Sequence, residues 1–312
     1  MTFIPLLLVP ETYAPVLLSR RARKLRKIPG NAHLYAPHEL EKKNIKHVLS
    51  VVLTRPVRMF FFEAIVLFSC LYLSFAYGIF YMFFQAYPVI YEQTYGFGGG
   101  EEGLTFLAIG VGACLSCVIY LTWDVVLRRA RVQNKAWIAR EETRRLPLAC
   151  LGGPFFILSC FWLGWTARKD IPWIVPVLSG VPFGIGYLLI FMALLNYLVD
   201  AYKIFAASAM AATSTARSLS GAALPFAAGP MYRKLGVPWA CSLLGFLSCL
   251  MAMIPFVFIW KGEQIRARSQ FCQFLLQKEK EDEEARLRKE EARKALAEGE
   301  AALGGAKSEE HV

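Results

Sequence analysis

The stretch MFFFEAIVLFSCLYLSFAYGIFYMFFQAY, residues 59–87, contains a single charged side chain, Glu63. About 20 helical residues cross the roughly 30 Å of hydrocarbon in a bilayer, because each residue adds about 1.5 Å. Inside lipid the backbone polar groups must bond within the protein. A continuous apolar run therefore favours a helix, whereas a closed barrel would show alternating strands of about ten residues. The stretch predicts a transmembrane helix.

Five further runs have the same character. With the first, they predict an all-α fold, a polytopic membrane helix bundle with six transmembrane helices over residues 59–260. The predicted spans are Met59–Tyr87, Gly103–Trp123, Leu146–Trp165, Trp173–Val199, Ile204–Met231 and Trp239–Trp260. Hydrophobic residues make up 56% of the 312 residues and charged residues 19%, which excludes a soluble globular enzyme and a disordered protein.

The basic residues are distributed unevenly along the chain. Of the 35 Lys and Arg residues, thirty lie in the segments 18–58, 124–145, 200–205 and 261–312, and four lie in the intervening loops. Cytoplasmic loops of membrane proteins are enriched in Lys and Arg, so both termini are predicted to be cytoplasmic. The net charge of +11 is then explained by membrane orientation, and no nucleic-acid partner is expected. Two roles stay open for the basic cluster 20–27: contact with anionic membrane lipid, or a contribution to membrane orientation alone.

The segments outside the bundle predict three further parts. Residues 1–17 begin with an apolar run too short to span and are interpreted as the remnant of a transmembrane helix. Residues 18–58 are expected to be a basic cytoplasmic loop, and residues 261–312 a charged cytoplasmic tail. The tail lacks a sustained apolar heptad seam, so a solvated single helix is favoured over a coiled coil.

Neither an enzyme nor a cofactor or metal site is indicated. The four histidines lie outside the predicted spans, and the eight cysteines lie in or just beyond them without accompanying histidines. Cys114 and Cys117, one turn apart in an apolar helix, are interpreted as small packing residues rather than half of a metal site.

Ionisable groups within or beside the spans are the first candidates for function. Arg217 lies near the middle of its predicted helix, where insertion costs about 2.5–3.5 kcal/mol, so it is expected to face a partner, a cavity or water. A substrate- or gating-linked role and a structural ion pair both stay open. Glu63 is a candidate partner of Arg217, a protonatable coupling group or an interfacial acid, and Asp200 is a candidate gate or loop anchor at a helix end.

Polar side chains also share a face of the first span. Ser74, Tyr77, Tyr81 and Gln85 follow helical spacing, which favours an aqueous cavity over lipid. Such a stripe suits flat, amphipathic or cationic ligands. Together with Asn196 and Arg217, the residues Tyr77, Tyr81 and Gln85 form the predicted substrate-binding set.

Glycine and proline clusters lie inside two spans. SGVPFGIG (179–186) and the LGGP of 151–154 would break soluble helices. In a membrane such clusters permit close helix contact, kinks or unwound segments beside a binding site.

Several long motifs resemble one family. VPETYAPVLLSRRARKLRK (9–27) resembles the signature that follows the sixth helix of fungal major facilitator drug:proton antiporters, a group with polyamine exporters and multidrug pumps. The segments LSGVPFGIGYLLIFMALLNYLVDAY (178–202) and AASAMAATSTARSLSGAALPFAAGPMY (206–232) are similar to later helices of that family. The resemblance is collinear over about residues 4–271. It implies the C-terminal half of a twelve-helix fold, preceded by the end of the sixth helix, so first-half gating motifs have no counterpart here.

The resemblance implies a transporter that exports small amphipathic or cationic compounds, such as drugs or polyamines, by proton exchange at the plasma membrane. Its partners would be a small-molecule substrate, protons, membrane lipid, and the missing N-terminal half or a second copy. The alternative is a truncated, non-transporting membrane protein that associates with a full-length relative or is inactive.

Overall fold

The computed structural model describes residues 14–28, 35, 45–269, 271–274, 277, 281 and 284. All regular secondary structure in these residues is helical, as the sequence predicts. The elements are α2 (Ala14–Arg26), α4 (Ile45–Phe62), α5 (Ala64–Tyr91), α6 (Gly99–Thr105), α7 (Leu107–Val132), η1 (Ala136–Ala139), α8 (Glu141–Thr166), α9 (Ile174–Leu178), α10 (Gly180–Tyr202), η2 (Lys203–Phe205) and α11 (Ala206–Arg268).

The chain divides into two units, residues 1–54 and 55–312. Most of the predicted helix remnant, residues 1–13, and most of the predicted tail, from residue 285 onward, lie outside the described residues. Within the first unit, α2 carries Arg23, Lys24 and Arg26 in its last turn, where cations interact favourably with the helix dipole.

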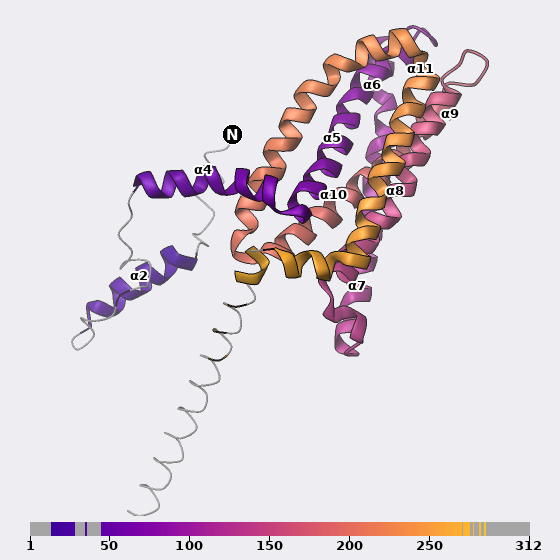
Figure 1. Cartoon of the computed structure of the whole chain (residues 1–312). Helices are drawn as coiled ribbons and strands as arrows, with labels where there is room; N and C mark the ends of the chain where they lie inside the picture. Colours follow the sequence, from indigo (N-terminus) through magenta and orange to yellow (C-terminus); the bar gives the residue numbers. More distant parts are fainter. Residues whose placement is uncertain are drawn as a thin grey trace, which may run out of the picture. The chain divides into compact units, whose positions relative to one another are not determined.

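The second unit is built around α11. This helix packs along both α5 and α8, while α10 packs against α8 and α7 (Figure 1). Within α11, one residue has non-helical backbone angles: Gly236, with φ 73° and ψ 162°. Residues that carry a Cβ atom rarely adopt these angles, so glycine at this position allows the chain to reverse direction. The limb before Gly236 runs beside α5, and the limb after it returns beside α8 (Figure 1).

Glycines bring the backbones of α7, α8 and α10 together. A Cβ atom on Gly184 of α10 would collide with the carbonyl oxygen of Ile109 in α7. A Cβ atom on Gly186 would lie 2.5 Å from the backbone nitrogen of Phe156 in α8. Of the alternatives left open for the two glycine clusters, close helix contact therefore occurs at 179–186. It also occurs at 151–154, where α8 continues unbroken and a Cβ atom on Gly152 would lie 2.9 Å from the Gly186 carbonyl oxygen.

Several helices begin or end at other residues than the predicted spans. Glu63 has extended backbone angles (φ −104°, ψ 107°) and separates α4 from α5, because it forms the N-cap of α5. Residues 59–62 therefore end α4 rather than begin the first span. In the second predicted span α6 and α7 meet at Phe106, and α7 continues to Val132.

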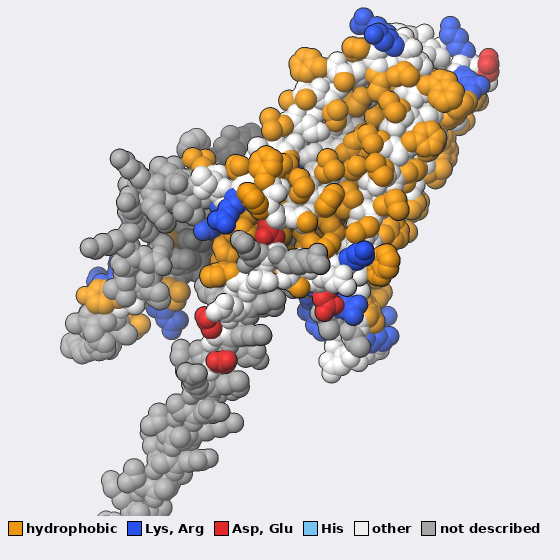
Figure 2. All heavy atoms as spheres, in the orientation of Figure 1, with side chains coloured by type: hydrophobic (Ala, Val, Ile, Leu, Met, Phe, Trp, Pro, Cys, Tyr) orange, Lys and Arg blue, Asp and Glu red, His pale blue; other side chains and the backbone are white. Residues whose placement is uncertain are grey.

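Four helical runs in the described residues are long and apolar enough to cross a membrane. They are Ala64–Pro88, Gly99–Val132, Glu142–Thr166 and Ile174–Ala267. The last run has 94 residues, so a count by continuous runs does not reproduce the predicted six spans. In the run Gly99–Val132, which contains α7, only 17% of the most apolar 18-residue stretch is buried. Apolar side chains cover much of the visible helix surface in Figure 2, as expected for a surface facing lipid.

Candidate functional site

An arginine and four aromatic rings meet where α5, α10 and α11 pack together. We name Tyr77, Tyr81, Tyr187, Phe191 and Arg217 the arginine–aromatic cluster. The Arg217 guanidinium carbon lies 5.8 Å from the centroid of the Tyr77 ring and 5.4 Å from that of the Phe191 ring. The Tyr77 and Tyr81 hydroxyl oxygens are 3.1 Å apart. The cluster thus combines a cation, π faces and hydroxyls, chemistry that orients a small ligand.

Close packing of α5 against α11 positions this cluster. The Ser220 hydroxyl donates a hydrogen bond to the Ser74 carbonyl oxygen at 2.6 Å. One residue further on, a Cβ atom on Gly221 would lie 2.7 Å from the Tyr77 ring. Glycine at this position therefore lets the Tyr77 ring lie against α11, within reach of Arg217.

Arg217 has no carboxylate partner within the described part of the chain. Its Nε donates a 3.4 Å hydrogen bond to the Thr213 carbonyl oxygen, and its guanidinium lies over the Tyr77 and Phe191 rings. The ion pair with Glu63, one of the alternatives that the sequence left open for Arg217, does not form among these residues. Instead, the buried Glu63 carboxylate accepts a 3.0 Å hydrogen bond from the buried Tyr202 hydroxyl. The Glu63 side chain is therefore buried within the protein.

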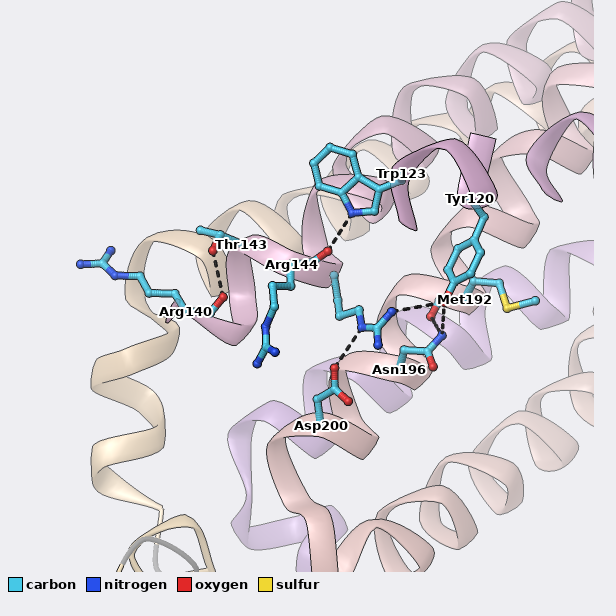
Figure 3. Close-up of polar contacts among 9 residues, drawn as sticks. Tyr120, Trp123, Arg140, Thr143, Arg144, Met192, Asn196 and Asp200 are labelled. Atoms are coloured by element: carbon cyan, nitrogen blue, oxygen red, sulfur yellow. Dashed lines mark hydrogen bonds and ion pairs between the residues drawn. The ribbon is translucent and has the colours of Figure 1, made fainter. Parts of the chain in front are cut away.

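A second polar group joins the middle of α7 to the start of α8 and the last turns of α10. We name Tyr120, Arg145, Asn196 and Asp200 the helix-end network, after the ends of α8 and α10 that it connects. Arg145 Nε donates to Asp200 Oδ2 at 2.9 Å, and Arg145 Nη1 donates to the Tyr120 hydroxyl at 3.2 Å (Figure 3). The Asn196 amide donates to the Met192 carbonyl oxygen at 2.7 Å and lies 3.5 Å from the Tyr120 hydroxyl. Asn196 and Asp200 therefore belong to the same network.

A further ion pair links the start of α8 to the end of α11. Arg266 Nη2, near the end of α11, lies 2.7 Å from Glu142 Oε1 at the start of α8. The Glu142 side chain is 3% exposed. This pair closes the α8–α11 contact at one end of the bundle.

The seven predicted site residues thus lie at four locations. Tyr77, Tyr81 and Arg217 lie together, Asn196 and Asp200 lie in the helix-end network, and Gln85 is exposed further along α5. Glu63 contacts Tyr202 at the start of α5.

Sequence reasoning missed five participants, Tyr120, Arg145, Tyr187, Phe191 and Tyr202. Arg145 looks like one more loop cation, since the predicted span begins at Leu146. The aromatic residues look like ordinary membrane side chains. No local signal distinguishes them, because their partners lie on other helices.

An apolar groove of about 270 Å³ lies between the end of α4 and α11. It is lined by Pro56, Val57, Phe60, Phe61, Ala212, Thr215, Ala216 and Leu219. Thr215 is its sole polar side chain, so the groove has little with which to orient a polar ligand. No group of three or more His, Cys, Asp and Glu residues suited to a metal ion occurs in the described ranges.

The sequence profile of the Major Facilitator Superfamily matches residues 1–225. The chain belongs to this superfamily. Membership confirms the resemblance to fungal major facilitator pumps and identifies the helical unit as part of a membrane transporter fold. The chain is accordingly an integral membrane protein with apolar helices.

Similar fungal proteins agree with this assignment. Efflux pump FUB11 of Gibberella fujikuroi is 40% identical over 265 residues, which cover 85% of this chain and 46% of that protein. The Citrinin biosynthesis cluster MFS transporter mrr1 of Monascus ruber is 40% identical over 272 residues, covering 86% and 53%. The multidrug transporter mdrA of Aspergillus fumigatus is 39% identical over 265 residues, covering 85% and 43%. The chain therefore spans about half the length of these relatives and matches their C-terminal half.

Proposed function

We propose that this Major Facilitator chain forms one half of an exporter and lines the path of small amphipathic compounds through the membrane. The observation that carries the proposal is Arg217, a cation within a membrane helix that contacts tyrosine and phenylalanine rings but no carboxylate among the described residues. Such a residue is expensive to insert and is usually retained for function. The names of the relatives, which include efflux pumps and a multidrug transporter, favour export.

We propose six membrane crossings with both termini in the cytoplasm, at the plasma membrane. The 94-residue run contains two breaks that suit reversals, Lys203 with φ 39° and Gly236 with φ 73°. The α8–α11 contacts support a reversal at Gly236, since Gly164 faces Cys241 whereas Gly153 faces Ala252. Successive contacts in opposite order identify antiparallel helices. Residues 18–58 and 261–312 would then be the cytoplasmic loop and tail.

We propose that proton exchange drives transport and that the helix-end network acts as the gate. Asp200 and Arg145 join α10 to α8 through an ion pair that is accessible enough to open, with 29% and 25% of their side chains exposed. Glu63, buried against Tyr202, is the second carboxylate that we assign to coupling. Opening either contact would release helix ends that move during alternating access.

The proposal is tested by drug efflux from yeast cells that lack their own pumps. Three strains are compared. One expresses this chain alone, one expresses the N-terminal half of Efflux pump FUB11 alone, and one expresses both. We expect loss of a fluorescent amphipathic dye to rise severalfold with both halves together, and to stop when a protonophore collapses the proton gradient. Absence of efflux with both halves at the membrane would contradict the proposal. Efflux that survives the protonophore would remove the coupling alone.

A second candidate function is a non-transporting membrane protein that associates with a full-length relative or with itself. Copurification of the chain with full-length mdrA, without any gain of efflux, would support this alternative.

A further inference from the structure

We infer that the arginine–aromatic cluster binds the anionic head of a flat aromatic acid, so that the exported compounds include aromatic carboxylates rather than polyamines. This inference rests on the proposed function, because it names a substrate class for the same site. The argument uses the charge at Arg217 and the arrangement of the rings beside it.

The first step concerns charge. Arg217 is half-buried, and its neighbours in the cluster are uncharged rings and hydroxyls. A polyamine would bring positive charges towards a guanidinium that no described carboxylate offsets, which is unfavourable in a medium of low dielectric. A carboxylate would instead find a planar fork of N–H donors suited to bidentate binding.

The second step concerns shape. From Arg217 the rings continue as a wall. Phe191 and Tyr187 have centroids 4.5 Å apart, and Tyr187 and Phe80 have centroids 5.0 Å apart with an interplanar angle of 22°. Tyr187 and Phe80 are partly exposed, so this end of the stack is not closed off by the protein. A flat aromatic body can lie along this wall while its acid group reaches Arg217.

The third step concerns the remaining polar atoms. The Tyr77 and Tyr81 hydroxyls are 3.1 Å apart, and Tyr81 is 38% exposed. A hydroxyl pair can form one mutual hydrogen bond and retains a donor for an acceptor atom of the ligand. These hydroxyls therefore add to carboxylate binding beside Arg217.

The test measures binding of three matched probes, 1-naphthoate, 1-naphthamide and 1-naphthylmethylammonium, to the purified full chain in lipid nanodiscs at neutral pH. The probes share one ring system and differ in charge. We expect 1-naphthoate to bind at least about tenfold more tightly than the cation, with the amide between them. Equal affinity for all three, or a preference for the cation, would overturn the inference.

Variants of Arg217 test whether this residue causes the preference for 1-naphthoate over the cationic probe. Arg217→Gln should weaken 1-naphthoate binding by about tenfold while leaving 1-naphthamide within about twofold. Arg217→Glu should reverse the preference towards 1-naphthylmethylammonium, a gain that a misfolded protein would not show. The matched control is Arg168→Gln, since Arg168 lies 5.6 Å from the Trp165 ring in an exposed position. Loss of 1-naphthoate binding in the control to the same extent would overturn the inference.

These binding measurements do not require transport. Arg217-dependent binding of 1-naphthoate without efflux would reject the proposed function and support the assignment of an aromatic carboxylate site to the cluster. Efflux of the dye that is accompanied by charge-independent binding of the three probes would reject the inference and leave the proposed function intact.

Discussion

Two arginines of the second unit show how differently a cation can be held beside membrane helices. Arg145, near the start of α8, forms an ion pair with Asp200 and a hydrogen bond with Tyr120. Arg217, within α11, contacts the rings of Tyr77 and Phe191 and one backbone carbonyl. The first has its charge balanced by the protein. The second has it balanced by no described carboxylate, so a ligand can complete its surroundings.

The largest effect on stability is expected from breaking the ion pair at Arg145. Asp200→Ala leaves a partly buried guanidinium without its carboxylate and should lower the free energy of unfolding by about 2 kcal/mol. Thermal unfolding of the purified chain in detergent measures the change. The control is Asp124→Ala, because the Asp124–Arg128 pair has the same 2.8–2.9 Å separation but an Arg128 side chain that is 79% exposed. That control should cost less than about 0.5 kcal/mol. Equal losses in both variants would contradict the distinction between the pairs.

An intermediate effect is expected at the junction of α4 and α5. Tyr202→Phe removes the hydroxyl that donates to the buried Glu63 carboxylate and should cost about 1–2 kcal/mol, since the acceptor is then left unsatisfied. The same thermal unfolding measurement applies. Adding Glu63→Gln to this variant should give less than the sum of the two single losses, because the residues share one contact. Strict additivity would show that the hydrogen bond contributes nothing.

The smallest effect on stability is expected at Arg217. Arg217→Gln removes interactions with two rings, worth about 0.5–2 kcal/mol in general, and also removes the cost of placing a cation within a membrane helix. These terms oppose each other, so the free energy of unfolding should change by less than about 1 kcal/mol. A loss as large as that of Asp200→Ala would mean that Arg217 has a structural role like that of Arg145.

Part of the candidate site could be predicted from helical spacing. The stripe on residues 74–85 places Tyr77 and Tyr81 on one face, and their hydroxyls lie 3.1 Å apart. The expense of a charge within an apolar helix singles out Arg217 without any structure. The glycine cluster at 179–186 indicates close helix contact, and Gly184 and Gly186 make such contacts with α7 and α8.

The pairing of these residues could not be predicted in the same way. Periodicity determines which side chains share a face of one helix, but it does not determine how neighbouring helices rotate or slide against each other. Asp200 therefore looks like an isolated helix-end acid, although its partner Arg145 lies 55 residues earlier. Glu63 likewise looks interfacial, although Tyr202 covers it from 139 residues away.

The amino-acid sequence by itself determined that this chain is a helical membrane protein of the Major Facilitator Superfamily, because long apolar runs, uneven basic loops and family motifs are all local properties of the chain. Only the tertiary structure decided that Arg217 lies against aromatic rings while Arg145 lies against Asp200. The physical reason is that the partners of a buried charge are set by the register of packed helices. That register depends on contacts such as those of Gly221 with Tyr77 and Gly184 with α7, which connect distant parts of the chain.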